Sequence, residues 1–439
     1  MVRFRAGRYD REILRLAVPA FGALVAEPLF LLSDSAIVGH LGTAQLGGLG
    51  VAGQALNTLV YLCVFLAYGT TAGVARRIGA GDRRAAVRQG IDGMWLAVAI
   101  GAVLIAVGWP LIPWIVDAFG ASAAVAPFAG TYLRISLFGI PSMLVVLAGT
   151  GVLRGLQDTR TPLAVSIGGF SLNLLLNAVF VLVLGWGIAG SAWGTVLAQT
   201  GSAAVYVAVV LRAARREGAP VRPDWAGLRT SATAGFGLLL RTAALRIVPI
   251  VGTSIAARMG DGEIAAYQVG FQVWTLLAFA LDAIAIAGQA ITGRYLGAAD
   301  VSATRAVTRR MVGWGVACGV VFGLAVLAVR PWLPDLFTSD GDVRHLLLLS
   351  LLLVAVLQPI AGVVFVLDGI LIGAGDGPYL AVTTLVATVV FLPAALLLYG
   401  ADAGLAGLWA AIGLWMATRM VTLGLRARGD RWMVTGAVR

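Results

Sequence analysis

Twelve apolar segments, each long enough to cross a lipid bilayer, limit what this chain can fold into more than any other feature. A hydrocarbon core about 30 Å thick is spanned by roughly 20 residues of α-helix. Such segments lie at about 14–39, 46–75, 88–116, 124–152, 162–184, 188–212, 232–258, 264–293, 307–330, 345–372, 378–399 and 404–426. Because 59% of the residues are hydrophobic and only 12% are charged, we predict an all-α, multi-pass membrane protein.

The arginines between these segments predict the orientation of the chain. They gather in both terminal tails and in the connections after the second, sixth and eighth segments, whereas 117–123, 185–187 and 400–403 contain none. Basic loops remain on the cytoplasmic side, so both termini are expected to face the cytoplasm, in the plasma membrane of a prokaryote. These loops account for the formal net charge of +11, and we expect no nucleic-acid partner.

The chain also contains an internal repeat. A constant offset of 218 aligns 39–82 with 257–300 and pairs Pro141 with Pro359, Gly151 with Gly369 and Asp158 with Asp376. Each repeat holds six segments, an even number, so the two lobes share one orientation and are related by a pseudo-two-fold axis along the membrane normal. We expect an N-terminal lobe at 1–212, a cytoplasmic linker at 213–231, and a C-terminal lobe with a short cytoplasmic tail at 232–439. Two such lobes predict an alternating-access carrier.

A carboxyl group inside the first segment needs an explanation. Counted from Arg15, Asp34 falls in the outer half of the bilayer, where an ionised side chain costs about 2.5–3.5 kcal/mol. A group that takes up and releases a proton is the economical explanation, and a static aspartate hydrogen-bonded to a neighbouring helix is the structural alternative. Glu27, two turns earlier on roughly the same face, is either a second proton-coupling group or the partner of an arginine such as Arg134.

Two amide side chains in the fifth segment are further candidates for a polar site inside the membrane. Asn173 and Asn177 are four residues apart on one helix face, so both amides can reach one partner. The alternative is an ordinary polar contact between membrane helices. Gln272 is a candidate for lining the cleft between the lobes.

The C-terminal lobe has intramembrane charges of its own. Asp282 and Asp368 each require a partner, and Arg241 and Arg246 are candidates. These four residues form either a structural charge network or a site in which an aspartate binds cationic substrate or relays protons.

A family resemblance is carried mainly by the first segment, through Pro28-Leu-Phe-Leu-Leu-Ser-Asp34-Ser-Ala-Ile-Val-Gly-His-Leu-Gly. This run resembles the first-helix signature of the multidrug and toxic compound extrusion family, in its DNA-damage-inducible-F-like branch. Ala280-Leu-Asp282 and Leu367-Asp368-Gly-Ile-Leu-Ile-Gly373 resemble the family's eighth and tenth helices, and the resemblance extends from about Glu12 to Arg428. It implies export of amphipathic or cationic organic compounds, driven by a proton or sodium gradient.

The resemblance also implies roles for single residues. Relatives carry a hydrogen-bonded cluster around the first-helix aspartate, and the matching positions here are Asp34, Tyr132, Asn173, Asn177 and Thr195. Pro19 matches a proline that bends the first helix during transport. Relatives often have a second aspartate where this chain has Asn177, which favours a single-proton site centred on Asp34. Because one chain encloses its own cleft, we expect a monomer whose partners are small organic substrates and membrane lipid, with no cofactor and no bound metal.

Other functions remain as alternatives. Sodium-coupled relatives have a glutamate where this chain has Leu245-Arg246-Ile247, which favours protons over sodium. A lipid-linked precursor flippase of the same superfamily would direct unpaired arginines at pyrophosphate, so the surroundings of Arg134, Arg241 and Arg246 distinguish it from an exporter. His40 and His345 have no serine or metal-ligand pattern beside them, so we expect no enzyme. Nothing resembles the repeated filter motif of a passive channel.

Overall fold

The computed structural model describes residues 7–438, except for the side chains at 8, 27 and 29–33. The first half of the chain forms α1 (Arg8–Gly39), α2 (Thr43–Cys63), α3 (Phe65–Gly79), α4 (Arg83–Ala118), α5 (Ala126–Leu137), α6 (Ile140–Gly155), α7 (Arg160–Asn177), a π-helical turn η1 (Ala178–Val183) and α8 (Gly187–Glu217). The second half forms α9 (Trp225–Met259), α10 (Asp261–Gly297), α11 (Val301–Val329), a 3-10 turn η2 (Leu333–Leu336), α12 (Gly341–Gly373), α13 (Gly377–Gly400) and α14 (Gly404–Arg428).

The described helices confirm an all-α, multi-pass membrane fold. Ten helical stretches are long and apolar enough to cross a membrane, and α5 with α6 makes an eleventh if the pair is one span. The predicted span 14–39 corresponds to α1, which is not in that count. The predicted span 124–152 is wrong as a single helix, because α5 and α6 meet at an angle of 54°. Pro141 in the first turn of α6 has no N–H to continue the helix ladder.

The chain divides into two compact units. One unit holds Gly22–Gly235, and the other holds Phe236–Ala437 together with the beginning of the chain as far as Phe21. The predicted linker at 213–231 is helical at both ends, because α8 extends to Glu217 and α9 begins at Trp225. The boundaries between units therefore fall inside α1 and α9, and the lobes expected at 1–212 and 232–439 remain a prediction from the repeat.

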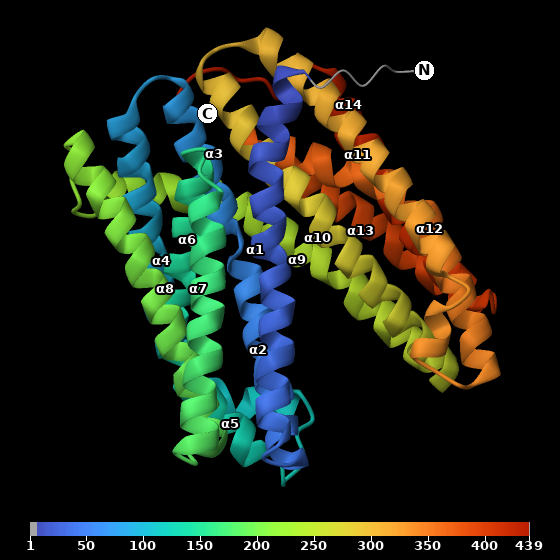
Figure 1. The fold of residues 1–439 in the computed structure, drawn as a ribbon. Coiled ribbons are helices and arrows are strands. Elements are labelled where there is room, and N and C mark those ends of the chain that lie inside the picture. The colour runs from blue at the N-terminus through green and yellow to red at the C-terminus, as the bar shows by residue number, and fades with distance from the viewer. Residues whose placement is uncertain (1–6, 439) are drawn as a thin grey trace. The chain divides into compact units, whose positions relative to one another are not determined.

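Within the unit Gly22–Gly235, α6 packs against α3, α4 and α8, while α7 packs against α8 (Figure 1, blue to green). Within the other unit, α12 packs against α10, α11 and α14, and α13 packs against α14 (Figure 1, yellow to red). The helix α6 in the first unit and the helix α12 in the second are thus the central elements around which each core forms.

Glycine contacts show that the repeat is also a repeat of packing. Gly151 of α6 lies so close to α3 that a Cβ atom there would overlap the backbone of Ala67. Gly369 of α12 meets the backbone of Ala285 in α10 in the same way. Gly369 follows Gly151 by 218 residues, and Ala285 follows Ala67 by the same offset. The same backbone approach is therefore built twice.

Helix caps repeat at the same offset. Asp82 accepts a hydrogen bond from the Ala85 backbone N–H at 2.8 Å and begins α4, while Asp300 accepts one from Ala303 at 2.8 Å and begins α11. Each aspartate satisfies a backbone N–H that has no partner within its own helix.

The beginning of α1 is attached to the second unit by two ion pairs. Arg310 of α11 donates two hydrogen bonds to Asp10, at 2.6 and 2.7 Å, and the indole N–H of Trp314 donates another at 2.8 Å. Glu12 accepts hydrogen bonds from Arg294 and, at 3.1 Å, from the hydroxyl of Tyr295. These contacts explain why α1 as far as Phe21 groups with sequence more than two hundred residues away.

Candidate functional site

Asp34 of α1 is buried inside the unit Gly22–Gly235, with 3% of its surface exposed. The amide Nδ2 of Asn177 donates a hydrogen bond to Asp34 Oδ1 at 2.6 Å, and the hydroxyl of Ser191 donates one to the same oxygen at 2.7 Å. In the part of the chain that the structure describes, no arginine or histidine forms an ion pair with Asp34. The carboxyl group is therefore held by neutral donors alone.

The hydrogen-bonded chain continues from Asn177 across two helices. Asn177 Nδ2 also donates to Asn173 Oδ1 at 3.1 Å, and Asn173 Nδ2 donates to the hydroxyl of Thr195 at 3.0 Å. Tyr132, a residue with only 4% exposure, lies in the wall of the same cavity as Asp34 and Thr195. The structure thus brings together all five residues that the family resemblance placed around the first-helix aspartate.

Ser191 belongs to this cluster, and the sequence reasoning missed it. The residue is completely buried in α8 and lies one helical turn before Thr195. A signal was present, because Ser191 and Thr195 are spaced by four residues on α8 as Asn173 and Asn177 are on α7. Two facing i,i+4 polar pairs in adjacent apolar helices would have identified it.

Local backbone features position Asn177. The helix α7 ends at this residue and continues as the π-helical turn Ala178–Val183, a rare geometry that often occurs at functional sites. On the facing helix α8, Gly194 leaves room for the amide, because a Cβ atom there would overlap Asn177 Oδ1 and lie 3.2 Å from its backbone nitrogen. Only glycine allows α7 and α8 to approach this closely at the level of Asp34.

A cavity of about 750 Å³ opens beside the cluster, within the unit Gly22–Gly235. Asp34, Tyr132, Asn173 and Thr195 contribute polar groups to its wall. The rest of the wall combines further amides with aromatic and apolar side chains, among them Gln54, Asn57, Tyr61, Met143, Phe170 and Gln199. A cavity of this size, with a wall that combines polar groups with a larger apolar surface, is suited to a drug-sized organic molecule.

The charges of the second unit form a separate group. Asp368 of α12 has 5% exposure and is bound by the guanidinium of Arg241, through Nε at 3.1 Å and also through Nη2. Arg419 of α14 lies 3.4 Å from the same carboxylate. Arg241 was an expected partner of Asp368 and Arg419 was not. The arrangement supports the structural reading of Asp368.

The remaining candidates lie on α10 and α1. On α10, Gln272 is exposed and Asp282 is half-buried. Pro19 lies within the continuous helix α1, two residues before the end of the segment that belongs to the second unit. The side chain of Glu27 lies outside the described residues, so its expected coupling role stays a prediction.

The architecture and this site define a class of protein. It is a helical membrane transporter with a solute-sized cavity and a buried carboxyl group that accepts hydrogen bonds from uncharged side chains. The family model MatE matches residues 19–179 and 228–397, well over half of the chain. The chain therefore belongs to the MATE family of multidrug efflux transporters and is not an enzyme.

Individual relatives agree with this membership. The chain is 31% identical to the chloroplastic protein DETOXIFICATION 44 of Arabidopsis thaliana over 434 residues, covering 94% of this chain and 81% of the relative. It is 29% identical to DNA damage-inducible protein F of Escherichia coli strain K12 over 420 residues, covering 94% and 91%. A crystal structure of a MATE protein in the bent conformation superimposes with a TM-score of 0.87 at 22% identity, covering 96% and 95%. The expected resemblance to the DNA-damage-inducible-F-like branch is confirmed.

Proposed function

We propose that this protein is an antiporter that exports amphipathic or cationic organic compounds in exchange for protons. The observation that carries the proposal is Asp34, a buried carboxyl group that lines a 750 Å³ cavity and, among the residues the structure describes, is bound by neutral donors. An arginine beside it would hold it ionised at all times. Without one, the protonation of Asp34 depends on the proton concentration on the side to which the cavity is open.

The cluster supplies partners for both protonation states. An ionised Asp34 accepts the hydrogen bonds from Asn177 and Ser191. A protonated Asp34 carries a donor of its own and needs an acceptor, since an unsatisfied polar group inside a membrane protein is costly. The buried amide oxygen of Asn177 has no hydrogen-bond partner among the described residues. Rotation of this one amide would give a protonated Asp34 its acceptor.

The same group links proton binding to substrate binding. An ionised Asp34 in the cavity wall attracts a cationic ligand, whereas protonation removes that attraction and leaves a neutral, hydrogen-bonded wall. Proton uptake from the outside therefore favours release of the substrate there, and proton loss to the cytoplasm restores the site. Bending of α1 near Pro19 is the proposed conformational step, because proline removes one backbone hydrogen bond from the helix.

We further propose a monomer in the plasma membrane of a prokaryote, with both termini in the cytoplasm. The arginine-rich connections support this orientation. The ion pair between Arg241 and Asp368 favours an exporter over a lipid-linked precursor flippase, because a guanidinium bound to a carboxylate has little affinity left for pyrophosphate.

The proposal is tested by flux of a cationic dye in proteoliposomes under proton and sodium gradients imposed separately. A proton gradient alone should drive transport, and Asp34→Asn should insert normally but lose that transport. Asp117→Asn is the matched control, because Asp117 is exposed at the end of α4. Equal transport by Asp34→Asn and the parent protein would refute the coupling role of Asp34. Transport driven only by sodium would instead assign the protein to the sodium-coupled exporters.

A further inference from the structure

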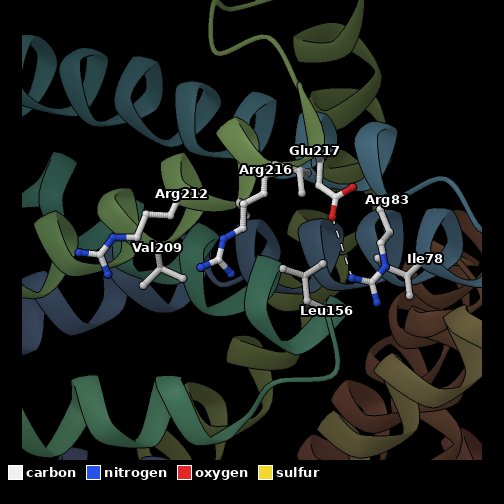
Figure 2. Close-up of a pocket in the computed structure, with 9 residues that line it drawn as sticks. Ile78, Arg83, Leu156, Val209, Arg212, Arg216 and Glu217 are labelled. Carbon is white, nitrogen blue, oxygen red and sulfur yellow. Dashed lines mark ion pairs between the residues drawn. The ribbon is translucent and has the colours of Figure 1, made fainter.

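A second cavity, of about 410 Å³, lies at the ends of α3, α4, α6 and α8 in the unit Gly22–Gly235 (Figure 2). It shares no lining residue with the cavity beside Asp34. Three of its lining residues are arginines, Arg83, Arg212 and Arg216. These helix ends carry the arginine clusters that predict the cytoplasmic side of the membrane. We call this cavity the basic pocket.

The positive charge of the basic pocket is only partly neutralised by the lining residues that the structure describes. Glu217 is the one acidic residue among the described lining residues, and it lies 4.0 Å from Arg83. Among residues 7–438, neither Arg212 nor Arg216 has an ion-pair partner. The two arginines are four residues apart on α8 and project from the same side of the helix (Figure 2). Like charges at this spacing repel, so an anion bound between them would relieve the repulsion.

Apolar side chains also line the basic pocket. Ile78, Val87, Leu156 and Val209 line it beside the arginines. A small, fully hydrated anion gains nothing from such a wall, whereas an anion attached to hydrocarbon buries apolar surface there. The lining therefore matches an amphiphile whose charged end carries a phosphate, which arginine binds with two parallel hydrogen bonds.

In the second repeat, the segment after α14 contacts the corresponding helix ends. Leu296, at the offset of 218 from Ile78, accepts a hydrogen bond from the Gly436 N–H at 3.0 Å. The segment after α14 thus packs against the ends of α10 and α11, where Asp430 forms an ion pair with Arg305 at 2.6 Å. The indole of Trp432 in that segment is 1% exposed. In the second unit, the segment after α14 thus brings an anionic side chain to an arginine near the corresponding helix ends.

We propose that the basic pocket binds the phosphodiester headgroup of an anionic phospholipid from the leaflet that surrounds these helix ends. Arg212 and Arg216 hold the phosphate, and the apolar wall receives the glycerol and the first part of an acyl chain. Pockets of arginine between helix ends on the cytoplasmic side are known sites for anionic headgroups. This inference does not depend on the proposed proton coupling.

Native mass spectrometry of the full-length protein in neutral detergent tests the inference, with phosphatidylglycerol as the probe and phosphatidylcholine as the zwitterionic comparison. The variant R212Q/R216Q should bind phosphatidylglycerol about 25-fold more weakly, since each basic residue near a membrane surface contributes roughly a factor of five. The control R215Q/R222Q removes the same charge from exposed positions outside the pocket and should bind like the parent. Glu217→Gln should strengthen binding, because it frees Arg83.

Three results would overturn the inference. Equal loss of binding in R212Q/R216Q and R215Q/R222Q would mean that net charge alone attracts the lipid. Equal retention of phosphatidylcholine would mean that the headgroup charge is irrelevant. Displacement of the lipid by glycerol phosphate at the same concentration would assign the pocket to a free phosphate, because the apolar wall would then contribute nothing. Elution as a single monodisperse species checks that each variant is folded.

Discussion

Replacement of Gly194 by alanine should damage the Asp34 cluster without touching any charged residue. The added methyl group would overlap the amide oxygen of Asn177, and the backbone of α7 leaves it no alternative space, because the Asn177 nitrogen lies 3.2 Å away. The amide must therefore move from the position in which it donates to Asp34 at 2.6 Å. The substitution combines the loss of a hydrogen bond with overpacking between two helices.

The expected size follows from these two effects. A hydrogen bond to a charged group contributes about 1.5–3 kcal/mol, which corresponds to a factor of roughly 10–150 in an equilibrium. We expect the proton-driven flux of Gly194→Ala to be lower than that of the parent protein by a factor in this range. Overpacking adds about 1–3 kcal/mol of destabilisation, so the thermal midpoint should fall as well.

Gly201 provides a matched control on the same helix. An added Cβ at Gly201 would lie 3.4 Å from Leu172 Cδ2, which is an ordinary contact. The assay compares the initial rate of dye flux and the thermal midpoint of Gly194→Ala and Gly201→Ala, reconstituted at equal density. If the two variants transport equally well, the bond from Asn177 to Asp34 has no part in transport, and the reasoning about Gly194 is wrong.

Three further predictions use other contacts. Ser191→Ala removes one of the two donors to the buried carboxylate and should reduce proton-driven flux about tenfold, whereas Ser191→Thr, which keeps the hydroxyl, should retain more flux in the same assay. Arg241→Gln leaves the buried carboxylate of Asp368 without its main partner and should destabilise the protein by about 3–5 kcal/mol. Adding Asp368→Asn should recover part of the lost stability in thermal melts. A double variant as unstable as Arg241→Gln alone would contradict the pairing. Hydrogen bonds from Arg310 hold the pKa of Asp10 well below its ordinary value. The contribution of the ionised Asp10 to stability is therefore complete above about pH 4 and is lost only as the pH falls through the lowered pKa. The difference in melting temperature between Asp10→Asn and the parent should stay constant from pH 5 to pH 8.

The sequence was sufficient to predict the parts of the site that follow from the free-energy cost of burying a polar group and from helical periodicity. A carboxyl group in an apolar span must have a reason, so Asp34 could be found from its position alone. Asn173 and Asn177 could be paired because four residues bring side chains to one helix face. The repeat could be found because both halves preserve the same glycines and caps at one offset, and these residues make the same backbone contacts in each unit.

Other features depend on how helices meet, which a single sequence does not state. A serine in a membrane helix usually bonds to its own backbone, so the spacing of Ser191 and Thr195 could place Ser191 on a polar face but could not show that its hydroxyl donates to Asp34. The π-helical turn after Asn177 has no composition that distinguishes it from an α-helix. Arg419 lies far along the chain from Asp368, and only the packing of α14 against α12 brings it within 3.4 Å.

The grouping of the first turns of α1 with residues 236–437 has a consequence for synthesis. At 5–20 residues per second, a ribosome needs roughly ten to forty seconds to pass from Phe21 to Phe236. During that interval Asp10 and Glu12 have been inserted while Arg310 and Arg294 do not yet exist. The nascent chain must therefore keep two acidic side chains waiting at the membrane surface. These two ion pairs can form only after α10 and α11 have been synthesised.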